Sequence, residues 1–135
     1  MSGSANKNNL VYPELSYKLM GVLFKVHNKL GPKRQEKYYQ RAIELELKKQ
    51  GISFKREKLV PLEYDGESMG RYFIDFVIEE KIALEVKSVE FFKRDFTAQV
   101  LGYLDVENLK LGIIANFNGN RLCYKRFINP KVKID

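Results

Sequence analysis

The spacing of apolar residues predicts two helices near the start of the chain. Across residues 13–30, apolar side chains recur every three or four positions, which is the spacing of one helix face. Gly31 follows, a residue suited to ending a helix. A second helical pattern runs from Pro32, which suits a first helical turn, to about Gln50. The first third of the chain is therefore predicted to be helical.

From residue 54 onward the pattern changes to the alternation that is typical of strands. It predicts three strands, at residues 54–64, 70–78 and 81–89. A third helix follows, which Asp95 caps and which ends at about Glu107. Two more strands are predicted at residues 109–117 and 121–127. Asp65-Gly66 predicts a turn, and Asn118-Gly119 predicts a two-residue hairpin. This order predicts an α/β fold with a mixed central sheet of about five strands flanked by helices.

Length and composition favour one folded domain. The chain has 135 residues, of which 44% are hydrophobic, so it fits a single core at residues 13–135. Residues 1–12 are mostly polar and predict a flexible N-terminal segment. No apolar run approaches the roughly 18 residues of a membrane-spanning helix. We therefore expect a soluble, cytoplasmic protein without a membrane partner.

Charge and residue usage narrow the chemistry. Lys and Arg number 24 against 17 Asp and Glu, a net charge of +7, which favours polyanionic partners such as nucleic acid. The single cysteine, Cys123, and the single histidine, His27, cannot form an internal disulfide, a zinc cage or a Ser-His-Asp or Cys-His triad of any richness. We expect His27 at the surface or a helix end, and Cys123 buried in its strand. Any metal must be a hard cation on oxygen ligands.

The predicted strand at residues 70–78 carries an acid among apolar residues. Regular alternation would place Tyr72, Ile74, Phe76 and Ile78 on one face, and Asp75 on the other face between Phe73 and Val77. A charged group in such surroundings costs several kcal/mol unless it is paired, hydrogen-bonded or bound to metal. Asp75 is therefore a candidate functional residue.

The next strand places Glu85 and Lys87 on one face, and the connecting turn decides whether Asp75 joins them. A three-residue turn at residues 79–81 would set Asp75 directly opposite Glu85, with the Cβ atoms about 5 Å apart. A two-residue turn would oppose Asp75 to Leu84 and send the two carboxylates to opposite faces. Only the first register permits a shared site.

Two carboxylates beside a lysine suit a Mg²⁺ or Mn²⁺ ion and a phosphodiester. The acids would hold the hard cation, the cation would polarise the phosphate, and the lysine would offset developing charge. This is hydrolytic nuclease chemistry. The alternative is that Asp75, Glu85 and Lys87 form an ion-paired patch on a solvated sheet face.

The chain resembles the GxxExxY proteins of the PD-(D/E)xK nuclease superfamily. The resemblance extends over most of the chain and rests on VHNKLGP (26–32), EKYY (36–39), AIELELKKQG (42–51), DFV (75–77), LEVK (84–87), AQVLGY (98–103) and LGIIAN (111–116). Two positions depart from the pattern. Lys33 stands at the first glycine of the family motif, and Ile74 stands where the superfamily's name has proline.

This resemblance implies a PD-(D/E)xK nuclease-like fold and a set of site residues. It implies metal binding by Asp75 and Glu85, charge stabilisation by Lys87, and completion of the metal site by Glu36, with Gln99 as a further catalytic-site residue. Glu36 also points the same way as the apolar stripe of its helix, as expected for a residue facing the sheet. The basic pair at residues 93–94 could meet phosphates, or form a solvated loop.

Two functions remain open at this point. The first is a Mg²⁺- or Mn²⁺-dependent nuclease that hydrolyses DNA, alone or as a homodimer. The second is an inactive nuclease-fold domain that binds nucleic acid or assembles with other proteins. Tyr39 and Tyr103 could line the site, although aromatic residues at helical spacing are more often core residues.

Overall fold

The computed structural model describes residues 11–134, so the predicted flexible segment lies almost wholly outside the described residues. Along the chain the elements are α2 (Pro13–Leu30), α3 (Glu36–Lys49), β1 (Phe54–Tyr64), β2 (Glu67–Ile78), β3 (Ile82–Lys87), α4 (Arg94–Val106), β4 (Leu111–Asn116) and β5 (Cys123–Ile128). The predicted order of helices and strands is confirmed. No helix within residues 11–134 is long and apolar enough to cross a membrane.

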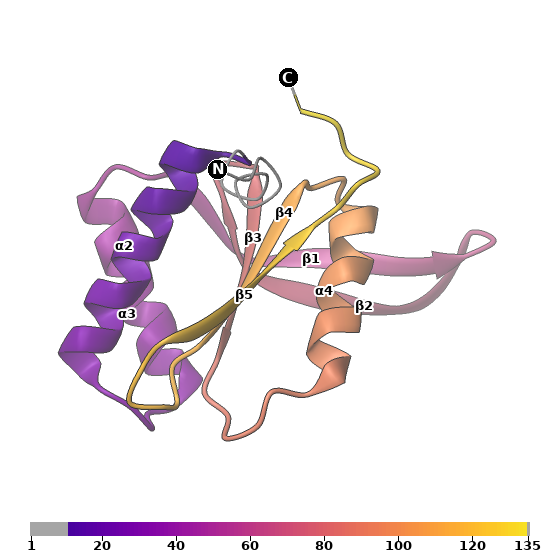
Figure 1. The fold of residues 1–135 in the computed structure, drawn as a ribbon. Helices are drawn as coiled ribbons and strands as arrows, with labels where there is room; N and C mark the ends of the chain where they lie inside the picture. The colour runs from indigo at the N-terminus through magenta and orange to yellow at the C-terminus, as the bar shows by residue number, and fades with distance from the viewer. Residues whose placement is uncertain (1–10, 135) are drawn as a thin grey trace, which may run out of the picture.

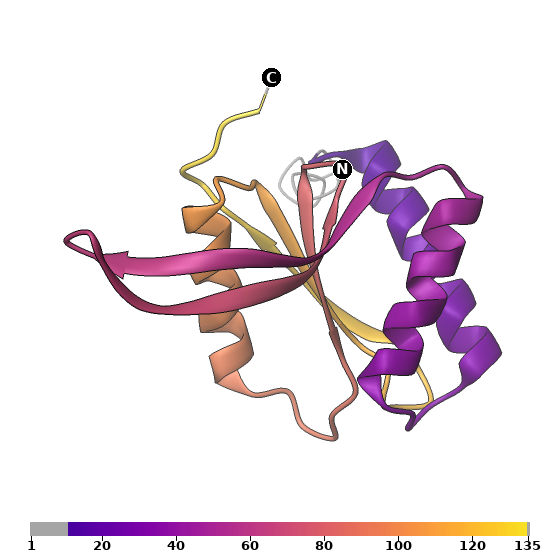
Figure 2. The ribbon, with the colours of Figure 1, turned by 180° about the vertical axis from the view of Figure 1, so that it is seen from behind.

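The strands form one mixed sheet in the order β1-β2-β3-β4-β5. All neighbours are antiparallel except β3 and β4, which run parallel because α4 carries the chain back between them. Helices α2 and α3 lie against one face of the sheet and α4 lies against the other (Figures 1 and 2). The predicted α/β class, with a five-stranded sheet flanked by helices, is confirmed.

Two apolar clusters hold these layers together. The first lies between the sheet and α2 and α3, and it includes Leu19, Leu23, Tyr39, Ile43, Phe76, Leu84 and Ile113. The second lies beneath α4 and includes Val60, Ile74, Val77, Val100, Tyr103, Leu104 and Ile114. Both faces of β3 and β4 are therefore buried, as is usual for parallel strands in α/β proteins.

The start of α3 differs from the prediction. The helix begins at Glu36, because Lys33 has a left-handed backbone (φ 63°) and Gln35 is extended, so Pro32 lies in the connecting loop. The Tyr39 hydroxyl fixes this loop by donating to the Gly31 carbonyl at 2.6 Å and accepting from the Arg34 amide at 3.1 Å. A left-handed backbone favours glycine, which agrees with the glycine of the GxxExxY motif at the position of Lys33.

Strand β2 does not keep one set of side chains on one face, as regular alternation had predicted. Phe76 belongs to the cluster beneath α2 and α3, whereas Ile74 packs with Val77 beneath α4. The change occurs at Asp75, and the register of β1 brings Glu57, which has a positive φ of 50°, opposite it. A local irregularity of the hairpin therefore sets the direction of the Asp75 side chain.

The outer half of this hairpin has a partly open face. Phe73 is 49% exposed and Leu59, its cross-strand partner, is 46% exposed. We expected Asp75 to lie among buried apolar residues on both faces of its strand, and this expectation is wrong, because one face is partly open and Asp75 itself is only half-buried.

Several other sequence-based expectations are corrected. Lys93 rather than Asp95 is the N-cap of α4, so Asp95 lies in the first helical turn, where its charge favours the helix dipole. Residues 117–122 connect β4 to β5, so Asn118-Gly119 does not form a two-residue hairpin. This loop is longer than predicted because it places two of its side chains, Phe117 and Leu122, in the buried core.

The only histidine lies near a helix end, in the last turn of α2, which is one of the two expected positions, but it is not at the surface. His27 is 5% exposed, and its Nε2 lies 2.9 Å from the Gly119 carbonyl oxygen, so it attaches α2 to the β4–β5 loop. Cys123 begins an edge strand and is exposed, although we expected it to be buried.

Gly112 allows α4 to approach β4 closely. A Cβ atom at this position would lie 2.8 Å from Val100 Cγ1 and 3.1 Å from a Leu104 methyl carbon. We expect Gly112→Ala to lower the free energy of unfolding by about 1 to 3 kcal/mol, because the branched Val100 side chain cannot move aside within its helix. Urea unfolding measures this change.

Gly102→Ala is the matched control. Gly102 lies inside α4, and a Cβ atom there would have no neighbour within 4 Å. This substitution should raise stability by roughly 0.5 to 1 kcal/mol through helix propensity. Equal responses of the two variants would contradict close packing at Gly112.

Candidate active site

The three-residue turn between β2 and β3 brings Asp75 and Glu85 together. Ile78 pairs with Ile82 and Phe76 with Leu84, and the same register places Asp75 opposite Glu85. Asp75 Oδ2 accepts a hydrogen bond from the Val86 amide at 2.8 Å, and Glu85 Oε1 accepts one from the Asp75 amide at 3.3 Å. Each carboxylate thus bonds to the neighbouring strand where regular pairing ends.

Glu85 is the more deeply buried acid of the pair, at 5% exposure. Burial first, and then the charge of Asp75, raise the pKa of Glu85 to about 8, although the Tyr103 hydroxyl and Lys87 partly oppose the rise. In the metal-free protein at neutral pH, Glu85 is therefore mostly protonated. A cation at this position would favour the charged form instead.

Tyr103 of α4 faces Glu85. Burial, and then the charge of Glu85, raise the pKa of the Tyr103 hydroxyl. This hydroxyl is buried and has no partner with normal hydrogen-bond geometry among the described residues, so it is close to Glu85 but not locked to it. The helical spacing had favoured a core role for Tyr103. Because only the packing of α4 against β3 brings Tyr103 to Glu85, the sequence carried no signal for this contact.

Lys87 and Gln99 also lie on the α4 side of the sheet. Lys87 Nζ is 4.5 Å from the centre of the Phe96 ring in α4. Gln99 is three residues after Phe96 and four before Tyr103, so it shares the helix face that meets Lys87 and Glu85. Asp75, Glu85 and Lys87 thus lie on the α4 side of the sheet, and helical spacing places Gln99 on the face of α4 that carries Phe96 and Tyr103.

Glu36 lies at the end of β3 and not within the Asp75–Glu85 pair. Its Oε2 accepts a hydrogen bond from the Ser88 amide at 3.2 Å, and α3 packs against the opposite face of the sheet from α4. Within residues 11–134, no three Asp, Glu, His or Cys side chains lie close enough together to hold a metal ion. The structure therefore brings two of the three predicted ligands together.

Asn116 fixes the segment that follows β3. Its amide group bonds both the Val89 amide, at 3.1 Å, and the Val89 carbonyl, at 2.9 Å. The Phe117 amide donates to the Lys87 carbonyl at 2.8 Å. In the sequence, the position of Asn116 at the end of a buried strand is the signal that could have indicated this structural role.

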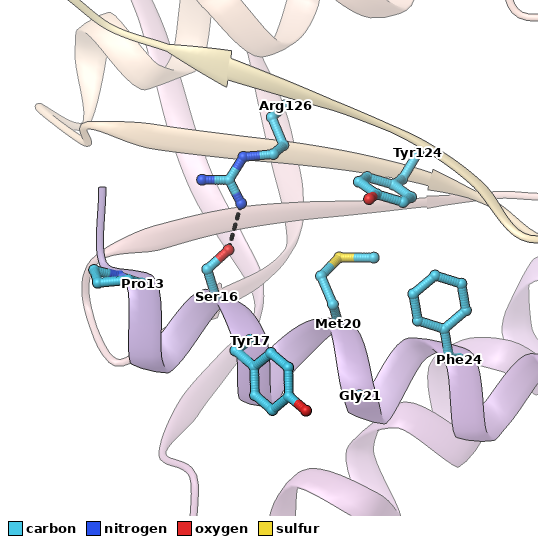
Figure 3. Close-up of a pocket in the computed structure, with 8 residues that line it drawn as sticks. All are labelled: Pro13, Ser16, Tyr17, Met20, Gly21, Phe24, Tyr124 and Arg126. Atoms are coloured by element: carbon cyan, nitrogen blue, oxygen red, sulfur yellow. Dashed lines mark hydrogen bonds between the residues drawn. The ribbon is translucent and has the colours of Figure 1, made fainter. Parts of the chain in front are cut away.

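A pocket of about 530 Å³ lies elsewhere, between α2 and β5. Pro13, Ser16, Tyr17, Met20, Gly21, Phe24, Tyr124 and Arg126 line it, and Ser16 Oγ accepts a hydrogen bond from Arg126 (Figure 3). No carboxylate lines this pocket. The acids that could support chemistry are instead on the opposite face of the sheet.

The donor set of the Asp75–Glu85 pair fits a divalent metal ion. Two carboxylates on adjacent strands supply the oxygen ligands that Mg²⁺ and Mn²⁺ prefer. Burial, and then the charge of Asp75, disfavour the charged form of Glu85, and such a cation would oppose both effects. Lys87 adds a cationic group on the same face of β3.

Residues 13–127 match the sequence model of the PD-(D/E)XK nuclease superfamily. The chain belongs to this superfamily, whose members are typically metal-dependent and act on nucleic acid. Its fold is similar to the crystal structure of SSO0001, with a TM-score of 0.53 and 20% sequence identity, over 67% of this chain and 48% of that one. At this identity the likeness supports the fold alone. The chain spans about half the length of that protein, and no curated protein matches it.

The raised pKa of Glu85 predicts a pH-dependent stability of the metal-free protein. The folded state holds a proton on Glu85 up to about pH 8, whereas the unfolded chain releases it near pH 4.5. The contribution to stability is complete below pH 4.5 and is lost as the pH rises through 8. We expect Glu85→Gln to remove a decline on the order of a few kcal/mol across this range.

Urea unfolding in EDTA at a series of pH values measures this difference. Glu90→Gln, at an exposed position, is the matched control and should follow the wild type. If the pH profile of Glu85→Gln runs parallel to that of the wild type, Glu85 is not protonated in the folded protein.

Proposed function

We propose that this protein is a Mg²⁺- or Mn²⁺-dependent nuclease of the GxxExxY branch that hydrolyses phosphodiester bonds in DNA. The observation that carries the proposal is the facing pair of carboxylates, each hydrogen-bonded to the opposite strand, with Lys87 on the same sheet face. Membership of the PD-(D/E)XK nuclease superfamily supports the reaction class. The positive net charge supports a polyanionic substrate.

In this proposal Asp75 and Glu85 hold the metal ion, which when bound polarises the phosphate and lowers the pKa of water. Asp75 is oriented for this role by the Val86 amide, which fixes one carboxylate oxygen at 2.8 Å. Glu85 would hold the cation as a carboxylate, without its proton. Lys87 then offers positive charge where negative charge develops on the phosphate.

Glu36 and Gln99 have supporting roles in the proposed site. Glu36 bonds to the Ser88 amide and so positions the end of β3, one residue beyond Lys87. Its carboxylate would be the third acid of the metal site. Gln99, which shares a helix face with Tyr103, contacts the substrate or the attacking water from α4.

Metal binding is tested by thermal unfolding in Mg²⁺ or Mn²⁺. The wild type should gain stability by mass action, about 2.7 kcal/mol at a metal concentration 100 times the dissociation constant. Asp75→Asn should lose most of this gain. It removes the charge but retains an oxygen for the Val86 amide, so the fold should be preserved. Glu36→Gln should reduce the gain to a smaller extent.

Asp65→Asn is the matched control for loss of one acidic charge, because Asp65 lies in the exposed turn at the far end of the β1–β2 hairpin. An equal metal response in Asp75→Asn and Asp65→Asn would place the metal elsewhere.

Lys87→Ala separates a nuclease from an inactive binding domain. A lysine is not a metal ligand when protonated, so metal binding should be preserved. Cleavage of DNA at saturating substrate should fall roughly 10²- to 10³-fold, as for loss of one electrostatic contact in a transition state. The exposed residue Lys18, on the opposite side of the sheet, provides the matched variant Lys18→Ala, which should cleave normally. Metal-loaded wild type that binds DNA without cutting it would instead favour the binding domain.

A further inference from the structure

The register of the sheet places a second lysine in line with the proposed metal site. Glu85 on β3 pairs with Ile114 on β4, and Ile114 pairs with Lys125 on β5. These three residues therefore form one row across the sheet, in which neighbouring side chains share a face. At a strand spacing of about 4.8 Å, the backbone of Lys125 lies about 10 Å from that of Glu85.

The side chains of β5 confirm which face Lys125 occupies. Tyr124 and Arg126 line the pocket against α2 (Figure 3), so the residue between them points to the other side. Lys125 Nζ is indeed 4.4 Å from the centre of the Phe92 ring, just before α4. Lys125 is thus an exposed cation on the same sheet face as Glu85 and Lys87.

A pair of aromatic rings links the two lysines. Phe92 and Phe96 pack edge to face, with centres 5.6 Å apart. Lys125 lies over Phe92 at 4.4 Å and Lys87 lies over Phe96 at 4.5 Å. Two ammonium groups are therefore held on one aromatic pair, one beside the proposed metal site and the other beyond it.

Phe91 projects from the same loop into solvent. It is 78% exposed, more than any other described phenylalanine. The loop is anchored before Phe91, where Ser88 bonds Glu36 and Val89 bonds Asn116, and after it, where Phe92 packs on Phe96. An exposed aromatic side chain is thus presented from a loop that is fixed on both sides.

We propose that Phe91 and Lys125 form a binding subsite for an unpaired nucleotide next to the scissile phosphate. Lys125 binds the neighbouring phosphate of the strand, and Phe91 stacks on its base. The placement next to a scissile phosphate rests on the proposed nuclease function, but binding of the strand does not. The exposed residues Lys93 and Arg94 extend the cationic surface, and Glu90 is the one acid between Ser88 and Arg94.

The exposed ring favours a single-stranded segment over a duplex. Stacking on an aromatic side chain needs an accessible base face, and in a duplex both faces of an internal base are covered by its neighbours. Lysine contacts to phosphate are available in both forms. Phe91 should therefore determine the preference for single-stranded over duplex DNA. Lys125 should add affinity for both forms equally.

The binding test uses metal-free protein in EDTA, so that it is independent of cleavage. Fluorescence anisotropy compares one labelled 12-nucleotide DNA as a single strand and as a duplex at fixed salt. Phe91→Ala should weaken single-strand binding roughly tenfold or more, with duplex binding unchanged, and Phe91→Trp should restore it. Lys125→Ala should weaken binding of the single strand and of the duplex. It should also reduce the slope of log affinity against log salt concentration by the amount expected for about one phosphate contact.

Two substitutions on the α2 side serve as controls. Phe24→Ala removes another exposed aromatic side chain, and Lys18→Ala removes another exposed cation. The proposal is overturned if Phe91→Ala behaves like Phe24→Ala on the single strand, or if it weakens duplex binding equally. It is also overturned if Lys125→Ala changes the salt dependence of DNA binding no more than Lys18→Ala does.

Cleavage kinetics with Mg²⁺ or Mn²⁺ then locate the subsite relative to the reaction. Phe91→Ala and Lys125→Ala should raise KM on single-stranded DNA and leave kcat nearly unchanged, in contrast to Lys87→Ala. A fall in kcat alone would contradict a binding role. Absence of cleavage by the wild type would contradict the proposed nuclease function but not the binding subsite, whose test needs no turnover.

Discussion

The structure depends on holding two carboxylates side by side, that of Asp75 on β2 and that of Glu85 on β3. Burial is the main cost of charging Glu85, and the charge of Asp75 adds to that cost. The fold meets this cost by giving each acid a backbone amide from the opposite strand. Regular strand pairing ends at this point, and β2 changes the cluster it packs against. The site and the distortion of the hairpin therefore have one origin.

The other elements act around this pair. Gly112 lets α4 lie close to β4, and α4 carries the side chains that face Glu85 and Lys87. Glu36 and Asn116 hold the segment after β3, although they come from α3 and β4. The face formed in this way continues through Phe92 to Lys125 on the edge strand. Residues from β2, β3, α4 and β5 and from the loop before α4 thus contribute to one surface, while α2, α3 and the pocket beside β5 lie on the other side of the sheet.

The central part of the site could be predicted because it depends on local geometry. The length of one turn decides whether Asp75 meets Glu85, and the three-residue alternative is the one observed. Lys87 follows from the period of a strand. Tyr103 could not be assigned, since its contact with Glu85 requires the packing of a helix against a sheet. Glu36 points to the sheet as expected, but its bond to Ser88 depends on where α3 begins, which the loop at Lys33 moved by four residues from the position predicted at Pro32.

By itself the sequence determined the order of the elements and the α/β class, and it reduced the pairing of Asp75 to two registers, because hydrophobic period and turn length act between residues close in the chain. Only the tertiary structure decided the burial of His27, the exposure of Cys123, the change of face at Asp75 and the row from Glu85 to Lys125. Each of these depends on contacts between segments far apart in sequence. Their energies come from packing and hydrogen bonds that no local pattern encodes.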